Sequence, residues 1–90
     1  MPDATVRVVN ALGLHARAAA QLVKLAGKFQ STITIARVDS DVSANARSIL
    51  GILTLAASFG SELNINVTGK DEDEALQAVS ELFEKGFGEK

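Results

Sequence analysis

The chain has 90 residues, nine Lys and Arg, eleven Asp and Glu, a single His and a net charge of −2. This length is enough for one small domain, residues 1–90, with a single hydrophobic core. The absence of cysteine excludes disulfides, thiolate metal sites and cysteine catalysis. Four Phe, with no Trp or Tyr, offer little stacking surface for nucleic-acid bases, so we expect no nucleic-acid partner.

The hydropathy and charge patterns indicate a cytoplasmic protein with no membrane insertion. The first three residues lack the features of a signal peptide, and no apolar run approaches the length that spans a bilayer. Residues 1–56 carry six basic and three acidic side chains, whereas residues 57–90 carry three basic and eight acidic ones. The basic first part favours acidic partners or phosphate, although such splits also arise by chance in short chains.

The first half of the chain alternates between strand and helix patterns. Residues 5–9 predict a strand with Val6 and Val8 facing the core, and residues 10–14 predict a loop. A helix over residues 16–26 should bury a stripe of Ala19, Leu22, Val23 and Ala26. Residues 32–38 predict a second strand, and turn residues at 39–40 predict a hairpin to a short strand over 41–44.

The second half repeats this rhythm. Residues 45–48 open a second helix that should bury Ile49, Ile52, Leu53 and Ala56 and turn Leu50 and Thr54 outward. Residues 63–67 predict a fourth strand. A third helix with an acidic first turn at 71–74 follows, and residues 86–88 should end the ordered chain. The third helix should bury a stripe of Ala75, Leu76, Val79, Leu82 and Phe83.

The resulting order is βαββαβα, an α+β fold. The strands alternate polar and apolar residues, which indicates a sheet with one covered face, and each helix has one apolar stripe. We therefore expect all three helices on that covered face.

His15 is the residue around which a function can be argued. It lies where a loop meets a helix start, whose free N–H groups and positive dipole end hold anions. Arg17 adds a charged fork suited to phosphate oxygens, and imidazole is a nitrogen nucleophile near neutral pH. These residues predict a phosphohistidine site, although a lone His at a helix start is more often an ordinary surface or capping residue. The carboxylates at 71–74 are more typical of a solvated helix start than of a metal site, so we expect no metal and no cofactor.

Two sequence motifs are similar to those of the HPr family, the histidine-containing phosphocarriers of the phosphoenolpyruvate-dependent phosphotransferase system. The first is Gly-Leu-His-Ala-Arg at 13–17, followed by Ala-Ala-Gln-Leu-Val at 19–23; the second is Asn-Ala-Arg-Ser-Ile-Leu-Gly-Ile-Leu-Thr-Leu at 45–55. The resemblance extends to residues 67–76 and to Leu82-Phe83. Ala18 departs from it, because family members usually have proline there. The closing residues 83–87 resemble NPr, the nitrogen-branch paralogue, so the sugar or nitrogen branch stays open.

The resemblance implies an open-faced β-sandwich with sheet order 1-4-2-3 and a stoichiometric phosphoryl carrier rather than an enzyme. His15 would accept a phosphoryl group at Nδ1 from enzyme I, with phosphoenolpyruvate as the ultimate donor, and pass it to a histidine of a IIA-type protein. Arg17 and the N–H groups of Ala16 and Arg17 would hold the phosphate. Ser48 would be a regulatory phosphosite, with an HPr kinase/phosphorylase as its partner. We expect a monomer whose partner-binding residues are Gln21, Lys24, Arg47, Ile49, Leu50, Gly51, Leu53 and Thr54.

Three alternatives remain open from the sequence. The domain could act mainly as a regulatory module that docks onto other proteins, with Ser48 phosphorylated or not, and Ser48 could simply cap its helix. A ferredoxin-like module for a small ligand or metal has the same strand and helix rhythm, but the chain has one His and no Cys. A phosphatase that uses His15 would need a second general acid, and none is evident nearby in the sequence.

Overall fold

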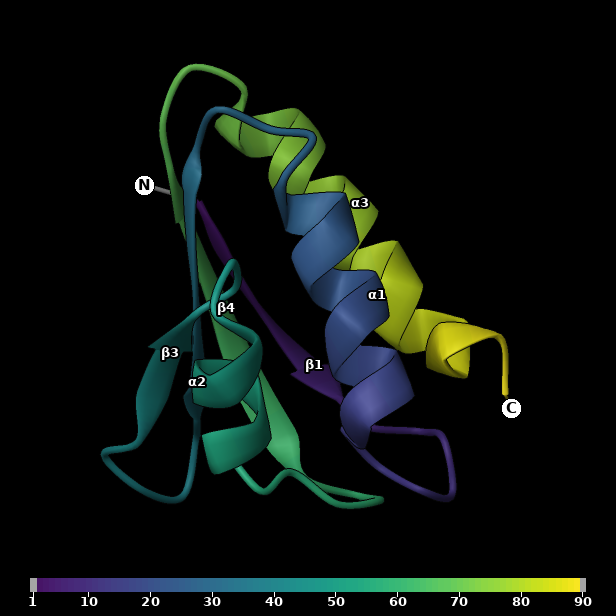
Figure 1. Cartoon of the computed structure of the whole chain (residues 1–90). Helices are drawn as coiled ribbons and strands as arrows, with labels where there is room; N and C mark the ends of the chain where they lie inside the picture. Colours follow the sequence, from purple (N-terminus) through teal and green to yellow (C-terminus); the bar gives the residue numbers. More distant parts are fainter. Residues whose placement is uncertain (1, 90) are drawn as a thin grey trace.

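A computed structural model describes residues 2–89 and confirms the βαββαβα order, with a short 3₁₀ turn added at the end (Figure 1). The strands are β1 (Asp3–Arg7), β2 (Thr32–Arg37), β3 (Ser43–Asn45) and β4 (Glu62–Thr68). The helices are α1 (Ala16–Ala26), α2 (Ile49–Thr54) and α3 (Glu72–Glu84), and the 3₁₀ turn η1 is Gly86–Gly88.

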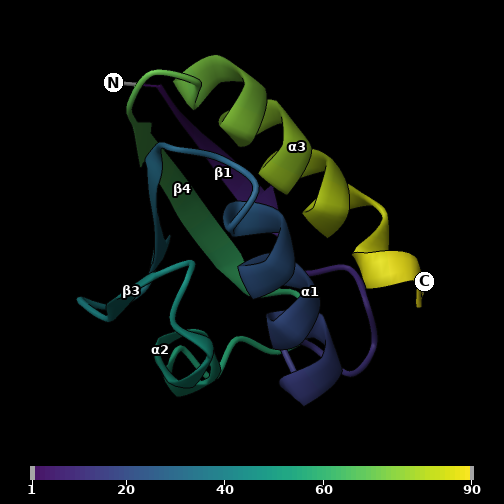
Figure 2. The same cartoon turned by 45° about the horizontal axis from the view of Figure 1, so that its top comes forward.

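The strands form one antiparallel sheet in the order β1-β4-β2-β3, as predicted. All three helices lie on one face of this sheet, with α1 and α3 side by side (Figures 1 and 2). Strand β4 shows the alternation that produces this arrangement. Leu63, Ile65 and Val67 are buried beneath the helices, whereas Asn64 and Asn66 point to the other face.

The core is a single cluster between the sheet and the helices. Val6 and Val8 are buried, as predicted. The predicted α1 stripe is right at Ala19, Leu22 and Ala26, but Val23 is only half-buried, and Ala18 is fully buried instead. The predicted α3 stripe is right at Ala75, Val79 and Phe83, while Leu76 and Leu82 are partly buried against the cluster.

Helix α2 differs from its predicted form because it has only six residues. Ile52 is buried, but Ile49, predicted to face the core, is 40% exposed. The helical period does not continue past Thr54, so Leu55 becomes buried and Ala56 is exposed with a left-handed φ of 51°. The stripe was therefore wrong at both of its ends.

The predicted strand ends also move by a few residues. β1 begins at Asp3 rather than residue 5, and β3 covers Ser43–Asn45 rather than 41–44. Val8 lies beyond β1 but its N–H still donates to the Ser61 carbonyl at 2.9 Å, which continues the pairing. Strand ends of this kind depend on partner strands that local sequence patterns do not describe.

A carboxylate ties the start of α3 to the loop that leaves α1. Asp71 accepts hydrogen bonds from the Ser31 hydroxyl at 2.5 Å and from the backbone N–H groups of Ser31 and Gln30 at 3.0 and 2.9 Å. These donors, the Ser31 hydroxyl first, hold the pKa of the Asp71 carboxyl below its usual range. Gly69 allows the close approach, because a Cβ there would lie 2.6 Å from the Ser31 Cα.

The segment at residues 86–88, where the ordered chain was predicted to end, forms the 3₁₀ turn η1 and packs into the core. Phe87 is 3% exposed, and its ring packs edge-to-face on Phe83 with the centroids 5.0 Å apart. Residues 86–89, which follow α3, are thus part of the folded domain and return toward the first turn of α1 (Figure 2). Among residues 2–89, no helix combines the length and apolar character that crossing a bilayer would require.

Candidate functional site

His15 is the N-cap residue of α1, as its place before the helix predicted. Its backbone is extended, with φ −78° and ψ 179°, and its carbonyl accepts the first helical bond from the Ala19 N–H at 2.8 Å. The ring Nδ1 accepts a hydrogen bond from the Arg17 N–H at 3.2 Å. The loop that leads into α1 requires glycine at position 13. The φ of Gly13 is +70°, and a Cβ there would lie 2.6 Å from the Ala57 carbonyl oxygen.

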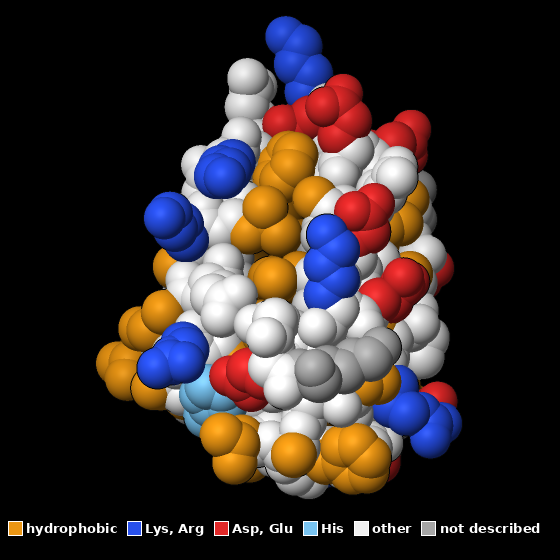
Figure 3. Space-filling view, turned by 90° about the vertical axis from the view of Figure 1, so that its right-hand side faces the viewer, with side chains coloured by type: hydrophobic (Ala, Val, Ile, Leu, Met, Phe, Trp, Pro, Cys, Tyr) orange, Lys and Arg blue, Asp and Glu red, His pale blue; other side chains and the backbone are white. Residues whose placement is uncertain are grey.

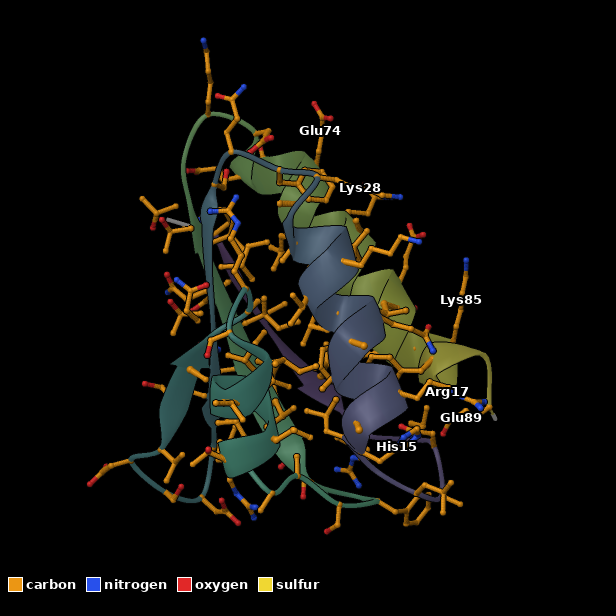
Figure 4. All side chains as sticks on the ribbon, viewed as in Figure 1. His15, Arg17, Lys28, Glu74, Lys85 and Glu89 are labelled. Atoms are coloured by element: carbon orange, nitrogen blue, oxygen red, sulfur yellow. The ribbon has the colours of Figure 1, made fainter. Side chains whose placement is uncertain are left out.

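The other ring nitrogen of His15 faces a carboxylate that the sequence did not predict. Nε2 lies against Oε2 of Glu89 in a short contact, and Oε1 of Glu89 accepts a hydrogen bond from Asn10 Nδ2 at 3.0 Å. Asn10 holds the pKa of the Glu89 carboxyl below its usual range, and His15 and the charge of Arg17 add to this effect. Figure 4 shows His15, Arg17 and Glu89 together where the chain end meets the start of α1.

Arg17 is exposed and lines a shallow open pocket with Ala11, Leu12, His15 and Glu89. The pocket combines a nucleophilic ring, a guanidinium and the N–H groups of a helix start. This combination can hold an oxyanion next to His15. Ala18, where the resemblance expects proline, is the third residue of α1 and is fully buried.

Ser48 is the N-cap residue of α2, and its exposed Oγ accepts a hydrogen bond from the Gly51 N–H at 3.0 Å. The predicted capping role is therefore confirmed. Arg47, next to it, donates through its guanidinium to the Phe29 carbonyl. Helices α1 and α2 are in contact, so His15 and Ser48 cap neighbouring helices (Figure 1).

A family model described as the PTS HPr component phosphorylation site matches residues 2–85. The chain belongs to the HPr family. It is 47% identical to the phosphocarrier protein HPr of Xylella fastidiosa (strain Temecula1) over 89 residues, which cover 99% of this chain and 98% of that protein. It is also 44% identical to the phosphocarrier protein NPr of Proteus mirabilis over 84 residues, or 93% and 92% of the two chains. The crystal structure of HPr-C-His from Thermoanaerobacter tengcongensis superposes with a TM-score of 0.92 at 40% identity, over 100% of this chain and 99% of that one.

Only some of the predicted partner-binding residues are exposed in this HPr fold. Lys24, Arg47, Ile49, Leu50 and Thr54 are exposed, whereas Gln21, Gly51 and Leu53 are partly buried. Gln21 has a different contact, because its side-chain amide donates to the Phe87 carbonyl at 3.2 Å. Leu12 at 75% and Phe59 at 67% are exposed apolar residues outside the predicted partner-binding set. Leu12 lines the His15 pocket.

Three residues around the HPr site were not predicted from the sequence: Asn10, Phe87 and Glu89. Asn10 was assigned only to a loop, yet it is fully buried. A large apolar residue between two glycines, Gly86-Phe87-Gly88, was the available signal that the tail packs back. Residues 2–89 contain no group of three or more His, Asp or Glu side chains placed to hold a metal ion.

Proposed function

We propose that this HPr-family chain carries a phosphoryl group on His15, accepting it from enzyme I and passing it to IIA-type proteins. The observation that supports this most is the position of the ring. Nδ1 lies over the first turn of α1, 3.2 Å from the Arg17 backbone nitrogen, and His15 and Arg17 line the same pocket. A phosphoryl group on Nδ1 would meet free N–H groups and a guanidinium at once.

The protein needs to supply little covalent chemistry for phosphoryl transfer. Phosphoryl transfer depends on in-line positioning and on neutralising the equatorial oxygens, which Arg17 and the N–H groups of Ala16 and Arg17 can supply. Arg17 is exposed rather than enclosed. A clamp of this kind holds the group and still lets it leave, as a carrier requires.

The surface around His15 supports docking of another protein. Leu12 and Leu50 are each 75% exposed and Phe59 is 67% exposed. Figure 3 shows hydrophobic side chains beside and below His15, next to basic ones. An apolar patch with a basic border fits an acidic partner surface that surrounds a reactive centre. We propose this patch, with Lys24 and Arg47, as the shared docking surface for enzyme I and IIA-type proteins, used by a monomer.

Incubation with enzyme I and labelled phosphoenolpyruvate tests the carrier role. The chain should take up label that is lost in acid and survives in alkali, as expected for phosphohistidine. His15→Ala should take up none, and His15→Asn, which keeps a good helix cap, should behave in the same way. Ser48→Ala is the matched control at the neighbouring helix cap and should label normally. Acid-labile label on His15→Ala would contradict the assignment.

A regulatory role for Ser48 is a second proposal, supported by its exposure and by its place beside Leu50. Phosphorylation there would add nearly two negative charges to the proposed docking surface without removing a helix cap. It would slow transfer by repelling an acidic partner. Ser48→Asp is the variant that tests it.

A further inference from the structure

Both oxygens of the Glu89 carboxylate are held, one by Asn10 and the other by His15. Asn10 is fully buried, and its Nδ2 also donates to the Gly13 carbonyl at 2.7 Å. The two amide hydrogens therefore serve the loop that enters α1 and the tail that follows α3. Asn10 Oδ1 is buried with no hydrogen-bond partner among the described residues, so this orientation of the amide is set by its donors.

The segment that carries Glu89, residues 86–89, has a defined conformation. Phe87 has a φ of 56°, an unfavourable value for a bulky residue, and it lies between Gly86 and Gly88, whose φ values are also positive. The burial of its ring against Phe83 and the hydrogen bond from Gln21 hold this conformation in place. A strained turn with a buried anchor thus brings a carboxylate onto the nucleophilic ring.

The hydrogen-bonding capacity of the groups decides where the ring proton lies. An ionised carboxylate can only accept, so the Nε2 that faces Glu89 must carry the hydrogen. An N–H donor, that of Arg17, points at Nδ1, so this nitrogen must present its lone pair. The two contacts require the same tautomer.

We propose that Glu89 is a positioning residue for phosphoryl transfer: it keeps the His15 proton on Nε2 and leaves the Nδ1 lone pair as the nucleophile. This rests on the proposed carrier function of His15. The arrangement resembles the carboxylate of a serine-protease triad, which sets the tautomer of a histidine and stabilises its charged form.

The transfer step balances without a proton leaving the ring. The Nδ1 lone pair forms the new N–P bond, while the bond from phosphorus to the leaving atom of the donor protein breaks and that atom keeps the electron pair. The Nε2 proton stays in place, so the phosphorylated ring becomes positively charged, and the Glu89 carboxylate faces that charge. The Arg17 N–H, which Nδ1 no longer accepts from, becomes available to a phosphoryl oxygen. Onward transfer reverses these changes.

The proposal also predicts the lability of the phosphorylated form. A phosphorylated imidazole is a better leaving group when its other nitrogen is protonated, and Glu89 favours that protonated state. Glu89→Gln should therefore slow both the arrival of the phosphoryl group and its hydrolysis, each by roughly fivefold to tenfold, because a charged hydrogen-bond partner becomes a neutral one.

The test compares the unphosphorylated wild type with Glu89→Gln, Glu89→Asp and the matched control Glu74→Gln, on a residue that lies at the other end of the helix pair (Figure 4). Nitrogen-15 chemical shifts of the His15 ring report the tautomer directly, and they need no phosphorylation. We expect the Nε2–H tautomer in the wild type and in Glu74→Gln, a reduced preference in Glu89→Gln, and partial recovery in Glu89→Asp. Transfer from enzyme I and the lifetime of the phosphorylated form should follow the same ranking.

An Nδ1–H tautomer in the wild type would overturn the proposal, as would a Glu89→Gln protein whose tautomer and transfer rate both match the wild type. A change in Tm alone, with ring shifts unchanged, would reduce Glu89 to a packing contact and also overturn it. Failure of every protein to accept a phosphoryl group, with the tautomer ranking as expected, would contradict the carrier function and leave the role of Glu89 in setting the tautomer supported.

Discussion

Asp71 and Glu89 hold the two ends of the same helix pair, and they do so with the same chemistry. Asp71, before α3, accepts from the loop after α1, and Glu89, after α3, accepts from residues at the start of α1. Both carboxyl groups have a pKa below the usual range because of these donors. The difference lies in the donors. Asp71 meets a hydroxyl and backbone N–H groups, whereas Glu89 meets an amide and the imidazole ring that we propose as the nucleophile.

A carboxylate that joins two helices becomes part of a reactive centre through the group that it binds rather than through its own geometry. Removing Asp71 should change only stability. Removing the exposed Arg17 beside His15 should change only transfer. The four predictions below test that separation.

The largest effect is expected for Arg17→Ala at the His15 end. Loss of one charged contact to the phosphoryl group should slow transfer from enzyme I by about ten- to a hundredfold if the contact forms in the transition state. Stability should barely change, because an exposed arginine contributes little to it. Quench-flow transfer rates and calorimetry measure the two quantities. Unchanged kinetics would remove Arg17 from the site.

Asp71→Asn should show the opposite behaviour, with a Tm lower by several degrees at pH 7 and an unchanged transfer rate at temperatures where the variant is folded. The Asp71 carboxyl has a lowered pKa in the folded state, so its contribution to stability is present above its ordinary pKa and is lost as the pH falls through the folded value. The gap in Tm between wild type and variant should therefore narrow in acid. Calorimetry at pH 7 and at successively lower pH values checks this, and a gap that widens in acid would contradict it.

Ser48→Asp tests whether a negative charge on the docking surface, with no contact to the His15 ring, is enough to slow phosphoryl transfer. Ser48→Asp should slow transfer roughly twofold to tenfold by repelling an acidic partner, and added salt should relieve part of this. Its Tm should stay level or rise slightly, since Asp also caps a helix. Ser48→Ala should lose about 1 kcal/mol of stability with the lost cap and transfer normally. Slow transfer that follows loss of the fold would rule out the electrostatic explanation.

The smallest effect is expected for Ala18→Pro, which restores the usual family residue in the first turn of α1. The N–H of this third helical residue has no intrahelical partner to lose. A stiffer unfolded chain should then raise stability by about 0.4–1 kcal/mol. Because Ala18 is fully buried, the proline ring must fit the core. A clear fall in Tm would show that it does not, and the transfer rate should be unchanged in either case.

The parts of this molecule that local sequence predicts are those that local interactions determine. The caps at His15 and Ser48 and the sheet order implied by the family resemblance were predicted correctly. Ile49 and Ala56 were not, because the period assumed for α2 depends on where the helix ends, and Leu55 enters the core only after that end. Asn10 and Glu89 lie 79 residues apart in the chain, so their hydrogen bond leaves no local pattern to read.

The turn at Phe87 also determines where a tag or fluorophore can be attached without reaching the His15 pocket. Glu89 reaches the His15 ring from the segment that follows α3, so a fluorophore attached to this segment would lie next to the proposed docking surface. Figure 1 places the start of β1 at the opposite end of the sheet from the first turn of α1. A tag on that end leaves the pocket open. Transfer rates measured with protein labelled on the segment after α3 would report on the label as well as on the carrier.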